Sequence, residues 1–210
     1  MSKKNPEKTS PLERYKKTVL LIEEQRVIIL LTGQTVEHVF DAAEQLTGEG
    51  HRLFGIDYKI PGVSKRLKSL KRMGERRPGV YSISTAKDAR NAINAGAEFV
   101  FSTHPDKSIS GKCGRERIIH AAGALTPKEV KEANDLGADA VSLYPCSAMG
   151  GTDWLTRLKE MFPAFKYIPT DVMTPGEARE YLKAGAYAAA PIIDAGNIEE
   201  ARKLIMEFAD

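Results

Sequence analysis

The segment TPGEAREYLKAGA at residues 174–186 decides the fold, because three other parts of the chain resemble it. Each copy begins with a threonine suited to cap a helix N-terminus, and these are Thr35, Thr85, Thr126 and Thr174. An acidic residue three positions later supports the cap in three copies, whereas the first copy has Glu37 one place early and then His38. Each copy ends at a glycine, within residues 48–51, 95–97, 136–138 and 184–186, where the left-handed conformation stops a helix. The sequence therefore predicts four helices with matching starts and ends.

Short apolar runs flank each of these helices. They cover residues 53–57, 99–102, 140–144 and 187–193 after the glycines, and 27–31, 80–84, 117–121 and 166–170 before the caps. Runs this short and apolar are typical of buried parallel strands. Further helices are predicted at 62–73, near 108–115, at 152–161 and at 198–208. Eight alternating strands and helices in 210 residues favour an α/β fold, a (β/α)8 TIM barrel, over an open doubly wound sheet.

The N-terminal part of the chain precedes this alternation. We assign residues 1–26 to an N-terminal extension and helix, and residues 27–210 to the barrel. We expect the leading segment, residues 11–24, to form an extra helix that covers the floor of the barrel.

Composition excludes several classes of protein. Hydrophobic residues make up 42% and charged residues 28%, the net charge is +3, and no apolar run approaches the length of a membrane span. The densest basic run, residues 65–72, has the leucine spacing of an amphipathic helix, and we do not expect it to bind nucleic acid. Cys113 and Cys146 lie far apart with no CxxC motif, so we do not expect a disulfide scaffold in a chain of this size. We expect a cytoplasmic protein that binds neither nucleic acid nor membrane.

Polar residues follow the predicted strands, at the barrel end where active sites of this fold lie. They are Thr32, Asp57, Lys59, Ser82, Ser84, Ser102, His104, Ser142, Tyr144, Cys146, Thr170, Asp171 and Asp194. Such a set suits a small polar ligand, and it contains no nucleophile elbow, zinc motif or phosphate loop.

Several of these residues have two interpretations each. His104 is either an acid–base group or metal ligand, or a residue that caps the loop or lines the mouth, and the latter is favoured. Cys146 is either a reactive thiol or a small buried side chain, and the latter is favoured. Strand-end aspartates, Asp57, Asp171 and Asp194, either join His104 around a cation or cap loops.

Two further features also have alternatives. His120 lies within an apolar strand, so we favour a hydrogen-bonded core histidine there. The pair Gly150-Gly151 before Thr152 either presents N–H groups to an anion or forms a turn.

A set of motifs in order along the chain resembles a known family. They are GAEFVFS at 96–102, TPKEV at 126–130, LYP and then GG within 143–151, FPAFKYIPT at 162–170 and LKAGA at 182–186. They look like the 2-keto-3-deoxy-6-phosphogluconate / 4-hydroxy-2-oxoglutarate aldolase family, over nearly the whole chain from about residue 27. The resemblance implies a trimeric (β/α)8 barrel without a cofactor that cleaves 2-keto-4-hydroxy acids to pyruvate and an aldehyde through a lysine Schiff base.

The residues matching the family's catalytic groups differ from the family pattern. The imine-forming lysine corresponds to Ser142, whose hydroxyl cannot form an imine. The general base corresponds to Gly55, while Asp57 lies on the same side of the strand about 6–7 Å further along. Lys59 keeps the basic charge that ends this strand, and the arginine that ends the first strand corresponds to Thr32.

The phosphate-facing turns differ as well. The family's Pro-Thr-Gly-Gly turn reads PTDV at 169–172, so that Asp171 would repel a phosphate. The glycine-rich end of the last strand reads APIID at 190–194, where Pro191 removes a backbone donor.

Three hypotheses for function follow. The first is a carbon–carbon lyase on a keto acid that uses a relocated lysine, best placed at Lys59, while Lys166 is expected near the floor. The second is a barrel with altered, metal-assisted chemistry through Asp57, His104 and Asp171. The third is a non-catalytic trimeric barrel that binds a metabolite or a partner. We assign catalytic roles to Lys59, Asp57 and Ser142, and no metal ligand or cofactor. The predicted substrate-binding residues are Thr32, Ser82, Ser102, His104, Tyr144, Thr170 and Asp171. The expected partners are a small molecule, such as a keto acid, and two further copies of the chain.

Overall fold

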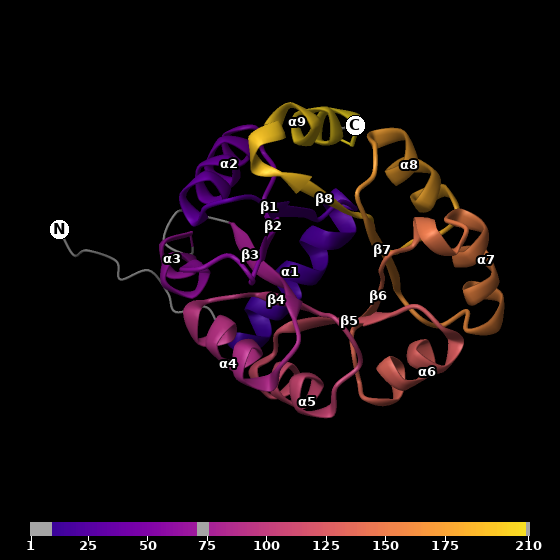
Figure 1. Ribbon diagram of the computed structural model, residues 1–210. Coiled ribbons are helices and arrows are strands. Elements are labelled where there is room, and N and C mark those ends of the chain that lie inside the picture. Colours follow the sequence, from indigo (N-terminus) through magenta and orange to yellow (C-terminus); the bar gives the residue numbers. More distant parts are fainter. Residues whose placement is uncertain (1–9, 71–75, 209–210) are drawn as a thin grey trace.

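The computed structural model describes residues 10–70 and 76–208, and it is a closed barrel of eight parallel strands ringed by helices (Figure 1). The strands are β1 (Ile29–Thr32), β2 (Leu53–Asp57), β3 (Arg77–Ile83), β4 (Phe99–Ser102), β5 (Ile119–Ala124), β6 (Ala140–Leu143), β7 (Tyr167–Asp171) and β8 (Ala190–Asp194). The last strand pairs with the first, with Leu30 opposite Ile192. The predicted (β/α)8 barrel is confirmed, and the open sheet is wrong.

Helices connect the strands and form the outer layer. They are α1 (Pro11–Gln25), α2 (Val36–Gly48), α3 (Val63–Leu70), α4 (Ala86–Ala95), α5 (Lys107–Glu116), α6 (Pro127–Asp135), α7 (Thr152–Met161), α8 (Pro175–Lys183) and α9 (Ile198–Glu207), with short 3-10 helices η1 (Ser147–Met149) and η2 (Ala195–Asn197). Three residues of the helix predicted at 62–73, those at 71–73, lie outside the described residues, as do the last two residues of the basic run.

The predicted caps account for where four of these helices begin. The hydroxyl oxygens of Thr35, Thr85, Thr126 and Thr174 each accept a hydrogen bond from the backbone N–H three residues later. The last two threonines form reciprocal capping boxes with Glu129 and Glu177. The glycines predicted to stop the helices have positive φ angles, at Gly50, Gly96, Gly137 and Gly185.

Several strand boundaries differ from those predicted. Strand β5 begins at Ile119 and runs to Ala124, because Arg117 has a φ of 55° and still caps helix α5. Strand β8 begins at Ala190, and Ala189 contributes only an isolated bridge to Val27. Strand β3 begins earlier than predicted, at Arg77. The apolar runs were found correctly, but their ends depend on caps and pairing that apolarity does not encode.

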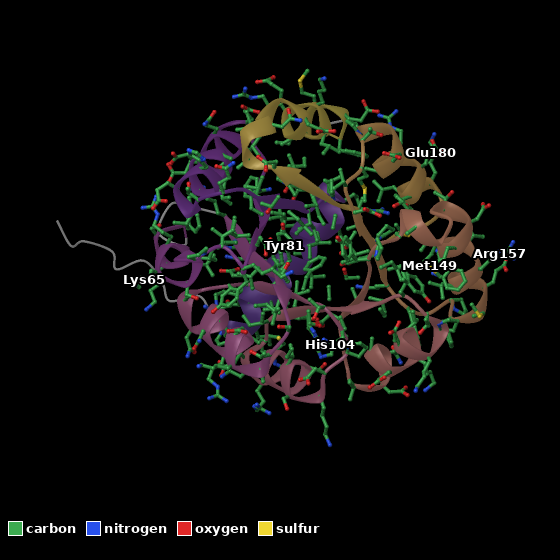
Figure 2. The ribbon with its side chains drawn as sticks, viewed as in Figure 1. Lys65, Tyr81, His104, Met149, Arg157 and Glu180 are labelled. Atoms are coloured by element: carbon green, nitrogen blue, oxygen red, sulfur yellow. The ribbon has the colours of Figure 1, made fainter. Side chains whose placement is uncertain are left out.

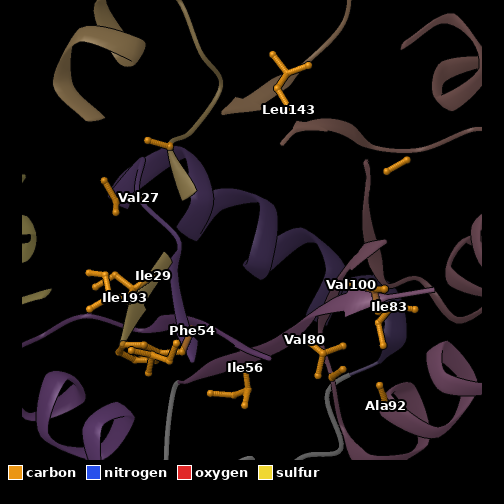
Figure 3. Close-up of a cluster of buried hydrophobic side chains, with 14 of the residues drawn as sticks. Val27, Ile29, Phe54, Ile56, Val80, Ile83, Ala92, Val100, Leu143 and Ile193 are labelled. Carbon is orange, nitrogen blue, oxygen red and sulfur yellow. The ribbon is translucent and has the colours of Figure 1, made fainter. Parts of the chain in front are cut away.

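Successive strand residues alternate between two apolar layers. On β1, Ile29 and Leu31 point outward to a cluster that includes Phe40 and Leu46 of α2, and Figure 3 shows part of this layer. Ile28 and Leu30 instead join Phe99 and other residues that fill the interior of the barrel. This alternation is the period of two expected of a strand, and it leaves a packed interior below the carboxyl ends of the strands.

Helix α1 closes the floor of the barrel, as predicted. Ser10 caps it in a capping box with Glu13, and its Leu21 and Ile22 are buried against the interior cluster that contains Ile28. The Thr18 hydroxyl reaches the buried carboxylate of Glu98 at 3.2 Å. In Figure 1 the helix crosses the barrel behind the strands. The opposite end of the barrel therefore holds the opening.

Candidate active site

A cavity of about 340 Å³ opens at the carboxyl ends of the strands. Its lining residues are Thr32, Asp57, Lys59, Tyr81, Ser82, Phe101, Ser102, Thr103, Gly123, Ser142, Tyr144, Thr170 and Ile192. They come from all eight strands or from the loops that follow them. The cavity lies where the fold predicts an active site, and its wall carries hydroxyls, one carboxylate and one ammonium group.

Eight of the ten predicted site residues line this cavity, and His104 and Asp171 do not. The exposed His104 ring is within 3.0 Å of the Thr103 hydroxyl, which fits a loop residue. The Asp171 carboxylate accepts hydrogen bonds from the backbone N–H and the hydroxyl of Ser147, at 3.0 and 2.6 Å. These two residues are therefore occupied with loop structure outside the cavity.

The residues of the metal hypothesis are not gathered into one cluster. No group of three or more histidine, cysteine, aspartate or glutamate side chains suited to a metal occurs within residues 10–70 and 76–208. Asp57 lies in the cavity, whereas His104 and Asp171 lie outside it, so the structure does not bring together the three predicted ligands.

Ser142, a buried serine of the cavity wall, forms a hydrogen bond whose direction follows from its neighbour. Thr170 donates its hydroxyl proton to the carbonyl of Ile168 at 3.1 Å, so Ser142, 2.8 Å away, donates to Thr170. Ser142 therefore keeps lone pairs for a ligand donor. The Ser142 hydroxyl is therefore hydrogen-bonded to Thr170 and not to a general base.

Ser102 sits in a second hydrogen-bonded chain. It donates to the carbonyl of His104 at 2.8 Å, so the His120 ring nitrogen Nε2, 2.9 Å away, must donate to Ser102. Ser110 then donates to the other ring nitrogen at 3.2 Å. Burial lowers the pKa of His120 to about 4, which keeps the ring neutral. His120 is thus the hydrogen-bonded core histidine that was predicted, and it does not activate Ser102 as a nucleophile.

Lys59 and Asp57 are the charged groups of the cavity wall, and both come from the end of β2. The Lys59 side chain is exposed, while its backbone N–H donates to Asp57 Oδ1 at 3.1 Å. Asp57 Oδ2 has only the Thr32 hydroxyl near it, at 3.5 Å. One carboxylate oxygen therefore remains available to a ligand or a proton.

Sequence reasoning missed Tyr81, which projects from β3 into the cavity (Figure 2). In a regular strand Tyr81 and Ser82 would point to opposite faces, yet both line the cavity. The reason is an irregularity in the β3–β4 pairing between Val80 and Ile83, where Ser82 has a φ of 63°. No local sequence pattern announces this bulge.

The remaining ambiguous residues have structural roles. Burial raises the pKa of Cys146 to about 11 and that of Cys113 to about 12, so both are inert thiols. Gly150 and Gly151 both have positive φ angles and form the turn before α7. Lys166 lies beside Glu23 and over the Tyr187 ring, 4.2 Å from its centroid, away from the cavity.

Fold and cavity together define a (β/α)8 barrel with a small polar site at its mouth. The chain belongs to the KDPG and KHG aldolase family, whose model matches residues 20–201. A 2-dehydro-3-deoxy-phosphogluconate aldolase of Treponema pallidum is 23% identical over 162 residues, covering 77% of each chain. The KHG/KDPG aldolase of Escherichia coli K12 is 21% identical over 193 residues, which is 88% of this chain and 91% of that protein.

A solved structure agrees with this assignment at the level of the fold. The KDPG aldolase of Legionella pneumophila, with pyruvate captured at low pH as a covalent carbinolamine intermediate, superposes with a TM-score of 0.74 at 19% identity, over 95% of this chain and 96% of that one.

No helix among the described residues is long and apolar enough to cross a membrane.

Proposed function

We propose that the mouth cavity binds a small 2-keto acid without forming an imine. The observation that carries this proposal is the composition of the cavity wall, which sets the Lys59 ammonium group among hydroxyls and one carboxylate. An ammonium group suits the carboxylate of a keto acid, and hydroxyls suit its carbonyl and hydroxyl groups. Relatives of this chain are named as aldolases of such acids, and the Legionella protein holds pyruvate.

The absence of imine chemistry follows from the two candidate positions. Ser142 offers a hydroxyl, which cannot condense with a ketone to form an imine. Lys59 lines the cavity but is exposed, and lysines that act as nucleophiles are usually desolvated so that a neutral amine is available. We therefore assign Lys59 to binding the ligand's carboxylate, and we expect cleavage through a lysine Schiff base to be lost.

The charges in and beside the cavity favour a ligand without a phosphate group. Asp171 stands at the end of β7, and its carboxylate is already bonded to Ser147. A dianion brought there would meet a like charge. The cavity wall contains one cation, Lys59, among its lining residues, and the ligand's carboxylate would occupy it.

Reaction with pyruvate and borohydride tests the proposal, with calorimetry to measure binding. We expect pyruvate to bind and no covalent adduct to appear, while an authentic aldolase is labelled in parallel. An adduct on Lys59 would instead show that the lyase chemistry has moved to this lysine. Absence of pyruvate binding would refute the keto-acid site.

Replacement of the lysine by a neutral side chain tests the ligand's orientation. Lys59→Met should weaken pyruvate binding about tenfold, because loss of a charge-assisted contact of about 1.4 kcal/mol corresponds to that factor. The matched control is Lys65→Met in α3, since Lys65 is exposed and outside the mouth cavity. Equal affinities of the two variants would contradict the role of Lys59.

We also propose a homotrimer in the cytoplasm, by analogy with the family and in keeping with the composition. Light scattering on the purified protein tests the assembly, and a mass of three times 23.1 kDa is expected. A monomer or dimer at micromolar concentration would contradict it.

A further inference from the structure

The Tyr81 hydroxyl is a buried polar group without a hydrogen-bond partner. The residue is 8% exposed, and Oη is inaccessible and unbonded. The Thr32 hydroxyl lies near enough to influence Tyr81, but its own hydrogen bond goes to Asp57 at 3.5 Å. A buried donor left unsatisfied costs about 1–3 kcal/mol, a cost that a ligand group accepting its proton would remove.

Asp57 lies directly beside Tyr81 on the neighbouring strand. The two residues are paired in the β2–β3 register, and both line the cavity. Paired residues of adjacent strands are about 4.8 Å apart. The bulge after Val80 does not disturb this pairing, because it lies on the side of β3 that faces β4. The site thus sets an unpaired phenol beside a carboxylate with one free oxygen.

The other buried hydroxyls of the wall cannot take the place of Tyr81. Ser142 donates to Thr170, and Ser102 donates to the carbonyl of His104. Both serines therefore face a ligand as acceptors. Tyr81 is the buried hydroxyl of this wall, within the described chain, whose proton has no acceptor in the protein.

From this arrangement we infer a further activity, which rests on the proposed keto-acid site: Asp57 and Tyr81 catalyse the enolisation of a bound 2-keto acid. The Asp57 carboxylate removes a proton from C3, and the C–H electrons form a C2=C3 double bond. The electrons of the C2=O bond move to the oxygen, where the Tyr81 hydroxyl donates a hydrogen bond to the enolate. Return of a proton from Asp57 to C3 restores the ketone, so the cycle consumes no other reactant.

This chemistry requires neither an amine nor a metal. A carboxylate base with a phenol that donates to the developing oxyanion is a sufficient set for proton abstraction next to a carbonyl. Burial first, and then the charge of Asp57, raise the pKa of Tyr81, so the phenol keeps its proton at neutral pH and can serve as the donor.

Loss of the methyl proton signal of pyruvate in D2O, followed by NMR, tests the inference. The wild-type protein should accelerate exchange above the buffer rate. Tyr81→Phe and Asp57→Asn should each reduce the protein-dependent rate about 100-fold. The matched control is Tyr58→Phe, since the Tyr58 hydroxyl is bonded to Ser64 at 2.8 Å and lies outside the mouth cavity. It should exchange like the wild type.

Calorimetric binding of pyruvate and thermal unfolding separate the possible results. Tyr81→Phe removes an unsatisfied hydroxyl, so the variant should be at least as stable as the wild type. An equal or higher midpoint of thermal unfolding would rule out misfolding as the cause of lost exchange activity. A wild-type protein that binds pyruvate without accelerating exchange would overturn the enolisation and leave the keto-acid site standing. Failure to bind pyruvate would overturn both, and full exchange activity in Tyr81→Phe would refute the role of Tyr81.

Discussion

At the end of β7 the Asp171 carboxylate accepts two hydrogen bonds from Ser147, the first residue of η1. This bond explains why a residue predicted to bind substrate lies outside the cavity. A charged side chain at a strand end serves the ligand only if the following loops leave it free.

The Asp171→Ala variant tests this interpretation. We expect the free energy of unfolding to fall by about 1–2 kcal/mol, because three hydrogen bonds to a charged acceptor, two from Ser147 and one from the Val172 N–H, are lost, with pyruvate affinity unchanged. A double-mutant cycle with Ser147→Ala, measured by urea unfolding, tests the contact directly. The double variant should lose less free energy of unfolding than the sum of the losses of the two single variants. A large change in pyruvate affinity would return Asp171 to the site.

Two buried histidines make stability depend on pH. Burial lowers the pKa values of His51 and His120 from 6.5 to about 4. Below pH 6.5 the unfolded chain binds protons that the folded chain excludes, so the free energy of unfolding decreases as the pH falls toward 4. Each histidine contributes a slope of up to about 1.4 kcal/mol per pH unit. Urea unfolding between pH 7 and 5 measures the slope. NMR signals assigned to His51 and His120 that titrate near pH 6.5 in the folded protein would contradict this account.

Most cavity residues could be predicted from the sequence, because parallel strands converge and polar residues at their carboxyl ends share one opening. Thr32, Asp57 and Ser142 were found in this way. Tyr81 was missed because strict alternation places either Tyr81 or Ser82 inside the barrel, and only the bulge turns both inward. Hydrogen bonding of side chains, as for Asp171, is equally invisible in one sequence.

Among the elements, β5 approaches the loop after β4 unusually closely. A Cβ atom at Gly123 would lie 2.5 Å from the Ser102 carbonyl oxygen and 2.6 Å from the carbonyl carbon of Thr103. These are backbone atoms, so only a shift of the loop could make room. The loop carries Ser102 and Thr103 into the cavity, and β5 therefore helps to define its shape.

Gly123→Ala should lower the free energy of unfolding by about 1–3 kcal/mol through this overpacking. The control is Gly48→Ala at the end of α2, where a Cβ atom meets nothing within 4 Å and alanine should stabilise by up to about 1 kcal/mol. Thermal unfolding of both variants measures the difference. Comparable stability of the two variants would show that the loop after β4 moves aside without lowering the free energy of unfolding.

Element boundaries were predicted best where a side chain forms the boundary. Thr126 and Thr174 start their helices where expected because their hydroxyls bond the exposed N–H groups. The start of β5 was misjudged because Arg117, although not glycine, adopts the left-handed conformation. Apolarity locates a strand, whereas its first residue depends on the preceding cap.

For the molecule as a whole, closure of the floor depends on α1. Leu21 and Ile22 are 5% and 1% exposed, whereas the adjacent Leu20 is 64% exposed. A helix that covers the floor was predicted for residues 11–24. Its contribution to the barrel comes from the packing of Leu21 and Ile22 against the interior cluster.

Ile22→Ala should lower the free energy of unfolding by about 2–5 kcal/mol, as expected for a cavity in a core. Leu20→Ala is the control and should change it by less than about 0.5 kcal/mol. Urea unfolding distinguishes the two. If the two variants lose similar amounts, α1 does not pack into the floor as described.

The closed floor has a consequence for the order of events in any reaction that involves two molecules. Since α1 seals one end, entry and exit share a single opening. A deeper-bound molecule must arrive first and depart last, which gives compulsory-order steady-state kinetics, with the outer product released before the inner one.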